Sequence, residues 1–440
     1  MTYRNYSLRD LIDIKHGFAF PGDKFSDNLH FPTLVTPGNF RIGGGFLEAK
    51  PKTFSGEPLE EYILQPGDLI VTMTDLSKAG DSLGFSAEVP SGRTYLHNQR
   101  VGKVVNKRPE LLSLKYLNWF MRTKEYRSSV MGSATGTTVR HTSPSRILEI
   151  KLNLPSLPVQ LTVANILDLI ESKIKTNHET SKTLEEIAQV IFKSWFIDFD
   201  PVKAKMVGEK PAGMDAATAT LFPDSMEESE IGIIPKGWLW ISVGEVASVI
   251  DCLHSKKPEL LEEGFPYLQL DTISDSGVLR FENAGLISKE DYDKWTSRIE
   301  VQGGDCLITN VGRVGAVSQV PDHFKAAIGR NITALRPKDA RLHRSFLIVA
   351  LLSDFMKKEI KRNTDSGTIL EALNVKNIPK LIIPGPSIFV LQEFAKLCDP
   401  IQLQLHELHE MNVNLKRIRD SLLPRLISGE LQIPEEMLAS

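Results

Sequence analysis

Cysteine is scarce in this chain. Its 440 residues include only three cysteines, Cys252, Cys306 and Cys398, which lie far apart. Isolated cysteines provide neither a disulfide framework nor the spacing of a metal site, so we expect no metal and a reducing, cytoplasmic environment. Long apolar runs are also missing, since no stretch reaches the roughly 18 apolar residues of a membrane span. The first residues carry charges where a signal peptide needs an apolar core, so we expect no export signal.

The sequence also lacks the short motifs of common active sites. It contains no glycine-rich nucleotide loop, no His-Glu-x-x-His helix and no Gly-x-Ser-x-Gly turn. The tetrad at 200–203, Asp-Pro-Val-Lys, does not match the Asn/Asp-Pro-Pro-aromatic motif of amino-methyltransferases. Pro-Asp pairs at Pro223 and Pro321 resemble the start of a nuclease motif, but no convincing strand with Glu-x-Lys follows. A long chain without a catalytic signature favours binding or scaffolding.

Charge of one sign does not dominate the chain. The net charge of −3 argues weakly against a nucleic-acid partner. However, residues 1–155 hold 20 Lys and Arg against 15 Asp and Glu, and residues 237–387 hold 19 of each, whereas the remaining stretches are acidic. An anionic partner should therefore meet these two stretches first.

The strongest feature present is a hydrophobic pattern that occurs twice. Between Val159 and Trp195, apolar or small residues recur in alternating steps of four and three, the heptad pattern of a helix packed along a seam. Adding 231 to these positions gives a second series between Phe394 and Leu426, and ten positions at one offset predict an internal duplication. The predicted seam residues are Val163, Leu167, Ile170, Ile174, Asn177, Leu184, Ile191, Trp195, Phe394, Ile401, Leu405, Leu408, Asn412, Leu415, Leu422 and Leu426.

Each seam follows a stretch of mixed strand and helix patterns. In the first stretch we expect strands at 69–73, 101–106 and 147–155, a helix at 114–131 and a loop at 132–145. The second stretch repeats this order, because 301–312 resembles 64–75 and 328–337 resembles 97–106. We therefore predict an α+β fold with two tandem mixed α/β domains, separated by a pair of long antiparallel coiled-coil helices and related by a pseudo-twofold internal repeat.

The expected parts have the following bounds. They are a first domain at 1–155, a central helix at 156–196, a connector at 197–236, a second domain at 237–387, and a C-terminal helix and tail at 388–440. The central helix, from about Pro158 to about Phe196, would be on the order of 55 Å long. Proline, glycine and acidic residues mark the connector.

Two positions in the helices allow sharper expectations. If the helices pair antiparallel about an axis near residue 179, Asn177 faces Asn412, and a buried polar pair could fix their register. Proline lacks the N–H group that an α-helix needs, so Pro400 predicts a kink or break at Cys398–Pro400.

Basic and polar residues occupy corresponding loops of the two domains. Arg, Asn and Gln side chains read base edges, and hydroxyl and backbone N–H groups suit phosphates. A single loop arginine is more often a solvated charge, and Asn98 and Asn331 could simply stabilise turns, but the duplicated placement favours a function for the set. The predicted contacts, with the four arginines as first choices, are Lys78, Asn98, Gln99, Arg100, Thr137, Thr138, Arg140, His141, Asn310, Arg313, Arg330, Asn331 and Thr368.

Over nearly its whole length the chain resembles the DNA-specificity (S) subunit of type I restriction-modification systems. The motifs that carry the resemblance are a Gly-Thr-Thr loop at 136–138, a Pro-rich turn at 155–158 with Gln160 at the helix start, and a more divergent copy ending in Gln392. Residues 231–238 resemble the family's entry to the second module, and 194–199 and 422–426 resemble its helix endings. The chain departs from the family pattern at Val159 and Leu391, where the family usually has Glu, which affects a local cap.

The resemblance implies a non-catalytic subunit with two target-recognition domains, each reading one half of a bipartite site in double-stranded DNA. It implies partnership in the cytoplasm with methylation subunits, two of them by expectation, and with restriction/translocase subunits. It also implies that no cofactor binds this chain, because S-adenosylmethionine, ATP and Mg belong to the partners. Target bases would be flipped into a partner's pocket.

Two interpretations from other classes remain open. The chain could contain an unrecognised methyltransferase or nuclease site, which modification or cleavage of DNA by the purified chain alone would support. It could instead be a coiled-coil scaffold without a DNA role, which failure of the reconstituted complex to bind any duplex would support.

Overall fold

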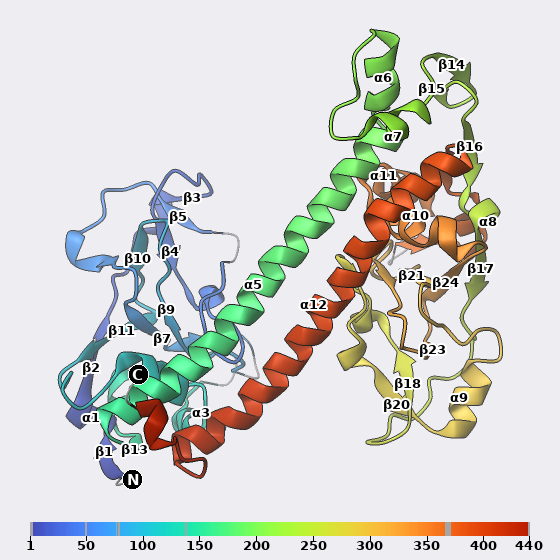
Figure 1. The fold of residues 1–440 in the computed structure, drawn as a ribbon. Helices are drawn as coiled ribbons and strands as arrows, with labels where there is room; N and C mark the ends of the chain where they lie inside the picture. The colour runs from blue at the N-terminus through green and yellow to red at the C-terminus, as the bar shows by residue number, and fades with distance from the viewer. Residues whose placement is uncertain are drawn as a thin grey trace. The chain divides into compact units, whose positions relative to one another are not determined.

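A computed structural model of the chain describes residues 3–48, 51–75, 77, 80–136, 139–365 and 371–438. The chain divides into two compact units, Met1–Lys173 with Leu415–Ser440, and Ile174–Asn414. Each unit contains one mixed α/β module and a part of both long helices, α5 (Leu157–Phe196) and α12 (Ile388–Ser428) (Figure 1). Among the described residues, no helix combines the length and the apolar character needed to cross a bilayer.

The module of the first unit is built on two small sheets. The first has the order β2-β11-β7-β9, all pairs antiparallel, and joins β2 (Ile12–His16), β11 (Val101–Asn106), β7 (Leu69–Thr72) and β9 (Ser86–Glu88). The second has the order β3-β5-β4-β10-β6 and joins β3 (Phe25–Ser26), β5 (Thr53–Phe54), β4 (Thr33–Val35), β10 (Tyr95–His97) and β6 (Ile63–Leu64). An antiparallel pair, β1 (Arg4–Ser7) with β13 (Lys151–Leu154), leads into α5.

The module of the second unit repeats this plan. Its main sheet has the order β17-β24-β21-β22-β19, from β17 (Ala247–Asp251), β24 (Ile332–Pro337), β21 (Cys306–Thr309), β22 (Val317–Gln319) and β19 (Gly277–Val278). Its smaller sheet joins β20 (Gly285–Ile287), β18 (Phe265–Leu268) and β23 (Ala327–Ile328), and β16 (Leu239–Ser242) pairs with β27 (Ile382–Gly385). The parallel pair β18·β23 matches the parallel pair β4·β10, so the predicted internal repeat is confirmed.

The helices within the modules differ from the prediction. The expected single helix at 114–131 is two helices, because the Thr123 side chain accepts a hydrogen bond from the Tyr126 N–H and starts a new helix there. Ser353 caps the corresponding helix in the second module in the same way. The module helices are α1 (Leu8–Leu11), α2 (Leu114–Phe120), α3 (Lys124–Ser133), α4 (Pro144–Leu148), α8 (Val243–Val246), α9 (Lys289–Trp295), α10 (Ala340–Leu352) and α11 (Asp354–Arg362).

The segment before α5 also differs from the prediction. The expected strand at 147–155 is shorter, because α4 is capped by Ser143 and extends to Leu148, so β13 begins only at Lys151. The expected loop at 132–145 contains the end of α3, the strand β12 (Arg140–His141) and the start of α4. The Ser143 cap thus starts a helix at the end of a stretch that was expected to be a loop.

The two long helices pack along the repeated heptad pattern, with α5 where the sequence predicts it. In the first unit, Val163 and Leu167 share a buried core with Leu423 and Leu426. In the second unit, the ring of Trp195 lies 6.1 Å from that of Phe394. Residue numbers rise along α5 as they fall along α12, so the helices are antiparallel. None of the sixteen predicted seam residues is exposed.

A buried amide pair lies in the seam within the second unit. Asn177 and Asn412 are 1% and 3% exposed, and the Asn177 Nδ2 donates a hydrogen bond of 2.9 Å to the Asn412 Oδ1. The hydrogen bond therefore pairs one polar atom of each buried amide. A buried amide without such a partner would lower the stability of the fold. Sliding one helix along the other would separate the two amides, so the pair favours one register.

Replacing both asparagines by leucine is expected to raise the melting temperature or to release the helix register, because an apolar pair suits several registers. Asn177→Leu alone leaves the Asn412 amide unpaired and is expected to cost about 1–3 kcal/mol of stability. Thermal melting and a cysteine cross-link placed across the seam would measure both effects. A double variant with lower stability in an unchanged register would contradict the assignment.

Of the kink or break predicted at Cys398–Pro400, the break is wrong, because α12 continues through Pro400 as one helix, and the kink stays a prediction. Phe394 and Cys398 before the proline, and Leu405 after it, are buried in the second unit. A proline removes one helical hydrogen bond and adds a clash of about 3 kcal/mol. Burial of apolar side chains on both sides of the proline, each contributing about 1.5–3 kcal/mol, offsets that cost.

The start of α5 is held by Gln160, which is fully buried. Its Oε1 accepts a hydrogen bond from the Ser113 N–H, and its Nε2 donates to the carbonyls of Leu111 and Pro155. The side chain thus ties the helix to the module before it. Gln392 was the expected copy, but it is exposed, and the buried residues beside it at the start of α12 are Val390 and Leu391.

The connector at 197–236 is a folded part of the second unit. It forms α6 (Asp200–Met206), α7 (Ala216–Thr220) and a hairpin of β14 (Met226–Ser229) and β15 (Gly232–Pro235). The ring of Phe222 lies 5.2 Å from that of Trp195 and 6.2 Å from that of Trp238. These aromatic contacts anchor the connector to the end of α5 and to the start of the second module.

A buried histidine lies where α12 packs on the second module. His406 is 8% exposed, and its Nε2 finds no hydrogen-bond partner among the described residues. Burial and then the Arg344 charge lower the pKa of His406 to about 4, with His409 and His323 acting in the same direction and Asp322 opposing them. The imidazole is therefore neutral in the folded protein at neutral pH.

Acid is expected to destabilise this contact. The unfolded state takes up the His406 proton near pH 6.5 and the folded state only near pH 4. The free energy of unfolding should therefore fall as pH falls through this window, by about 3 kcal/mol at most from this group. Urea unfolding of the wild type and of His406→Gln at pH 7 and 4.5 would measure it, since the variant should lose less stability. Equal losses would contradict the assignment.

Candidate nucleic-acid interface

In the first module, three segments with predicted contact residues meet at the carboxyl end of β7. The Met73 N–H donates to the carbonyl of Arg100 at 3.0 Å, and the Met73 carbonyl accepts from the Thr142 N–H at 3.0 Å. The chain then continues into β8 (Thr74–Asp75), which pairs with β12. The turn at 98–100 and the strand that carries Arg140 and His141 therefore lie beside one backbone segment.

The side chains of this cluster have different roles. The Asn98 Oδ1 accepts a hydrogen bond of 3.1 Å from the Arg100 N–H, so Asn98 shapes the turn. Gln99 and Arg100 are exposed and can reach a ligand, while Arg140 is half-buried. The exposed His141 has its Nδ1 3.2 Å from the Thr74 hydroxyl. Three further predicted contacts, Lys78, Thr137 and Thr138, lie outside the described residues.

Asp75 organises the loop that follows β8, a role that the sequence analysis missed. Its Oδ1 accepts from the Ser77 N–H at 2.6 Å, and its Oδ2 accepts from the N–H and hydroxyl of Ser82. Burial by itself would raise the pKa of Asp75, but these hydrogen bonds outweigh it and lower the pKa. The carboxylate therefore stays charged and holds the loop. The Asp-x-Ser spacing of an Asx-turn was its signal in the sequence.

The second module builds the same junction from different residues. The Asn310 N–H donates to the carbonyl of Asn331 at 3.0 Å, and the Asn310 carbonyl accepts from the Leu373 N–H at 2.8 Å. Leu373 belongs to β26 (Ala372–Leu373), which pairs with β25 (Thr364–Asp365). Asn310 thus takes the place of Met73, and Asn331 that of Arg100.

The predicted contact residues around this second junction differ in their exposure and in their hydrogen-bond partners. Arg330 is exposed. Asn331 has a φ of 67°, a left-handed conformation that asparagine tolerates better than most residues. Asn310 is 4% exposed, and its Oδ1 has no hydrogen-bond partner among the described residues. The Arg313 guanidinium instead donates to the carbonyl of Ile273 at 2.7 Å and pairs with Asp275. Thr368 lies outside the described residues.

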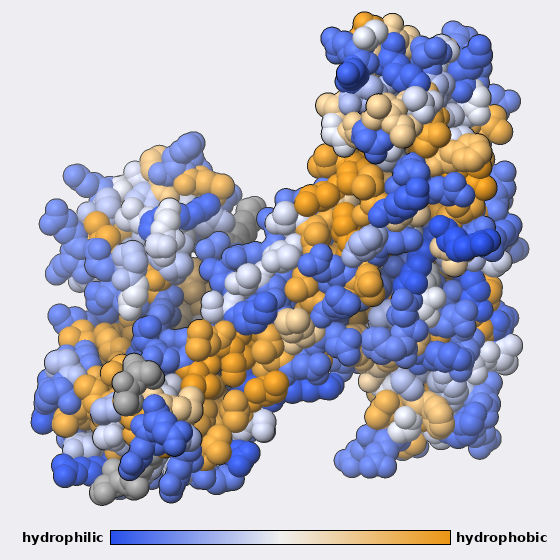
Figure 2. All heavy atoms as spheres, viewed as in Figure 1, coloured by the Kyte–Doolittle hydropathy of each residue, from blue (hydrophilic) through white to orange (hydrophobic). Residues whose placement is uncertain are grey.

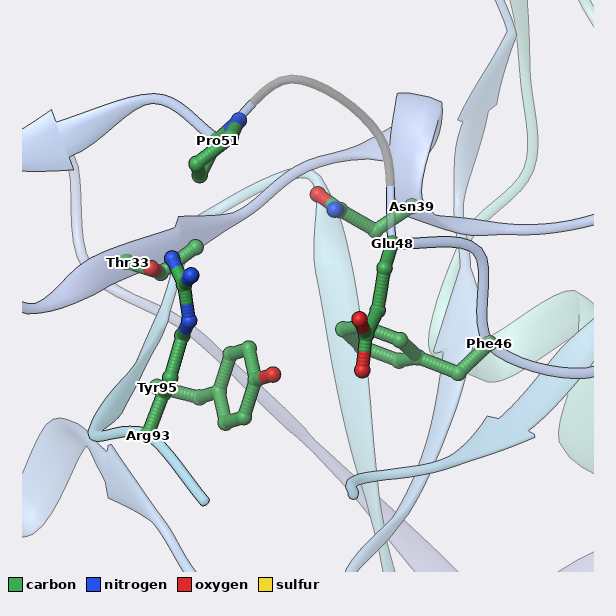
Figure 3. A pocket seen from close by; sticks show the side chains of 7 residues that line it. All are labelled: Thr33, Asn39, Phe46, Glu48, Pro51, Arg93 and Tyr95. Carbon is green, nitrogen blue, oxygen red and sulfur yellow. The ribbon is translucent and has the colours of Figure 1, made fainter. Parts of the chain in front are cut away.

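A pocket of about 160 Å³ lies on the five-stranded sheet of the first module (Figure 3). Figure 3 shows Arg93 and Tyr95 on one side of it and Phe46 and Glu48 on the other. Burial and then Glu48 raise the pKa of the Tyr95 hydroxyl. Tyr95 begins β10, whereas the turn at 98–100 follows the other end of that strand. The pocket is therefore separate from the loop cluster.

The paired clusters suit binding to DNA. Exposed arginine and glutamine side chains on hydrogen-bonded turns can donate to base edges, and arginine also pairs with phosphate. The backbone hydrogen bonds at Met73 and Asn310 hold each turn in place before any ligand arrives. Such pre-organisation reduces the entropy lost on binding.

Comparison with known proteins agrees with this geometry. Residues 2–186 match the family model described as type I restriction modification DNA specificity domain. The HindI specificity subunit of Haemophilus influenzae is 26% identical over 73% of this chain and 77% of its own. The EcoBI specificity subunit of Escherichia coli is 25% identical over 98% of this chain and 86% of its own.

A solved structure shows the same fold. The crystal structure of a type I restriction-modification system S subunit from M. genitalium superposes with a TM-score of 0.59 and 16% identity, covering 97% of this chain and 96% of that one. Residues 2–186 therefore match the DNA specificity domain of type I restriction modification, and the chain as a whole is similar to specificity subunits of type I restriction enzymes.

Proposed function

We propose that this chain is the non-catalytic subunit that reads a bipartite sequence in double-stranded DNA, one half-site per module, in the cytoplasm. The observation that carries the proposal is the duplicated junction at Met73 and at Asn310, which places an exposed arginine turn at the same point of each module. Arg100 and Gln99 serve one half-site, and Arg330 serves the other. Other lysines and arginines of the modules neutralise phosphates, which gives affinity but no sequence preference.

Catalysis belongs to partner subunits in this proposal. Methylation subunits, two by expectation, supply S-adenosylmethionine and receive the flipped target base. Restriction/translocase subunits supply ATP and Mg²⁺. None of these groups is assigned to residues of this chain, whose modules position DNA for the partners.

The long helices are the proposed docking surface for the methylation subunits. Figure 2 shows apolar residues gathered over α5 and α12. Soluble proteins rarely leave a row of large apolar side chains in water unless a partner covers it. The exposed apolar residues on the two helices are Leu161, Leu169, Ile187, Val190, Ile388, Phe389, Leu397, Leu403, Met411 and Ile418.

Mapping methylated adenines tests the function directly. With methylation subunits, the chain should direct methylation to a single bipartite motif in genomic DNA, and removing the chain should abolish that motif. The purified chain alone should neither methylate nor cut DNA. Modification by the chain alone would support the enzyme interpretation, and a complex that binds no duplex would support the scaffold interpretation.

A further inference from the structure

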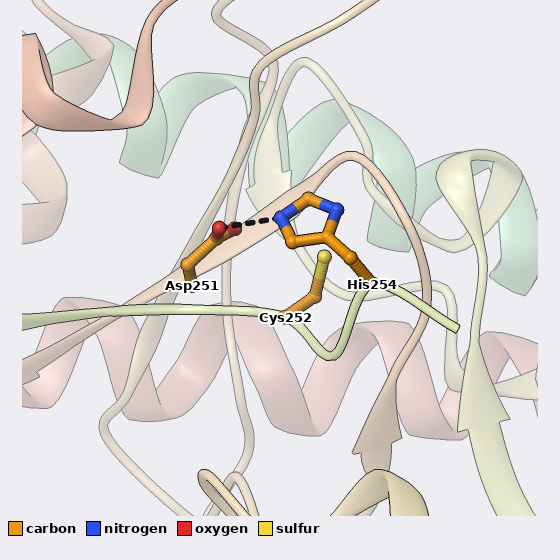
Figure 4. A group of neighbouring side chains, drawn as sticks. All are labelled: Asp251, Cys252 and His254. Carbon is orange, nitrogen blue, oxygen red and sulfur yellow. Dashed lines mark hydrogen bonds and ion pairs between the residues drawn. The ribbon is translucent and has the colours of Figure 1, made fainter.

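Three side chains of different metal-binding chemistry converge at the end of β17 in the second module. Asp251, Cys252 and His254 each offer a ligand atom, and these atoms lie within 4.8 Å of one another (Figure 4). The His254 Nε2 is 2.6 Å from the Asp251 Oδ2. Their sequence spacing, Asp-Cys-x-His, is too short to match a known zinc motif, which is why the sequence indicated no metal site.

The surroundings of the Cys252 sulfur include groups that favour a thiolate and groups that oppose it. The side chain is 1% exposed, and the backbone N–H groups of Asn331 and Ile332 lie near the sulfur. Such donors stabilise a negative sulfur and recur around metal-bound thiolates. Burial and the Asp251 charge oppose ionisation and raise the pKa of the free thiol. A bound cation would stabilise the thiolate and so offset the effects of burial and of the Asp251 charge.

A simple ion pair does not account for the cluster. The pairing of His254 with Asp251 uses one carboxylate oxygen, and the Cys252 thiol lies within reach of the same carboxylate. The second oxygen, Asp251 Oδ1, is buried without a hydrogen-bond partner among the described residues. A buried unpaired carboxylate oxygen carries a desolvation cost that a coordinated cation would relieve.

Arg298 is the competing cation at this place. Its Nη1 lies 3.9 Å from the Asp251 Oδ2 and donates to the Cys252 carbonyl at 2.9 Å. The Arg298 side chain is 48% exposed, so its guanidinium has access to solvent when a metal displaces it from the carboxylate. The arginine thus supplies the positive charge that the cluster needs when no metal is bound.

We propose that Asp251, Cys252 and His254 bind one divalent transition-metal ion of the zinc class, with water as the fourth ligand. A thiolate, a carboxylate and a neutral imidazole form a typical zinc donor set, and their two negative charges balance the ion. Tetrahedral coordination needs the donor atoms about 3.5 Å apart, so any pair near the 4.8 Å limit must approach, and the His254 Nε2 and Asp251 Oδ2, now 2.6 Å apart, must separate. His254, whose side chain is 58% exposed, has the freedom to move. Binding breaks the S–H bond and releases that proton to solvent.

Metal binding would also stabilise the turn that contains Arg330 and Asn331. The Cys252 sulfur lies near the backbone of Asn331, which follows the exposed Arg330. Fixing the sulfur therefore fixes the turn that is expected to read the second half-site. This consequence rests on the proposed function, whereas metal binding itself does not.

Titration of the full-length chain with Co²⁺ tests the site. We expect one ion per chain, a thiolate-to-cobalt charge-transfer band and visible bands of tetrahedral cobalt. Cys252→Ala should abolish the thiolate band, and His254→Gln should weaken binding at least tenfold. Arg298→Gln should retain or tighten binding, because it removes the competing charge. Cys398→Ala and His323→Gln are matched controls and should behave like the wild type.

Two further measurements keep the test independent of folding defects. Zn²⁺ added in weak buffer should release about one proton per chain from the wild type but not from Cys252→Ala, and it should raise the melting temperature of the wild type. No thiolate band in the wild type, or a band that survives in Cys252→Ala, would overturn the site. Metal binding that leaves recognition of the second half-site unchanged would overturn only the link to the turn.

Discussion

Removing one heptad from each long helix, residues 178–184 and 405–411, is expected to shorten the preferred gap between the two half-sites by about three base pairs. The two segments face each other, because Asn177 beside the first contacts Asn412 beside the second. Seven residues of α-helix measure about 10.5 Å. One DNA turn of about 34 Å contains roughly ten base pairs. The double deletion preserves the heptad phase of the seam, so the helices can still pair.

The experiment maps the sequence motif that the reconstituted complex methylates in genomic DNA. Both half-site sequences should stay the same while their spacing changes, and affinity should fall because the half-sites also rotate about the DNA axis. Lys182→Ala, an exposed substitution in the deleted segment, is the matched control and should leave the spacing unchanged. An unchanged spacing in a folded deletion variant would show that the length of the helices does not set the distance between the half-sites.

Arg100→Ala and Arg330→Ala are expected to relax the two half-sites separately. A bidentate arginine contact to a base contributes about 1–3 kcal/mol of discrimination, so selectivity at one base pair should fall roughly tenfold to a hundredfold. Each variant should alter only the half-site of its own module, because the two arginines occupy corresponding turns of different units. Methylation of libraries with one randomised half-site would measure the change.

The controls for this prediction are exposed arginines away from the junctions. Arg93→Ala in the first unit and Arg341→Ala in the second should leave both half-sites unchanged. If Arg100→Ala weakens binding to all duplexes equally and reduces its salt dependence, Arg100 contacts phosphate and not a base. A variant that relaxes the half-site of the other module would contradict the assignment of one half-site to each.

The long helices could be predicted from the sequence because their stability depends on a local, periodic pattern. A heptad seam specifies which face of a helix is buried, and its duplication specifies a partner of equal length. The same symmetry indicated that Asn177 faces Asn412. The resemblance in the short motifs then supplied the family. The seam and the order of the module elements could both be predicted because they are repeated within the chain.

The recognition junctions depend on tertiary structure. Met73 contacts Arg100 and Thr142 through backbone atoms, and backbone hydrogen bonds leave little trace in side-chain identity. The role of Gln160 also depends on segments about 50 residues away in the chain, as its bond to Ser113 shows. The break predicted at Pro400 is absent, because burial of its neighbours outweighs its local cost.

The sequence by itself thus determined the repeated architecture and the loops that are rich in arginine, asparagine and glutamine. Only the tertiary structure decided which of these side chains face solvent and which stabilise the fold. It left Arg100 and Arg330 exposed, turned Asn98 inward to its own turn and paired Arg313 with Asp275. The physical reason is that periodicity is a property of one segment, whereas exposure is decided by all the segments that pack around a residue.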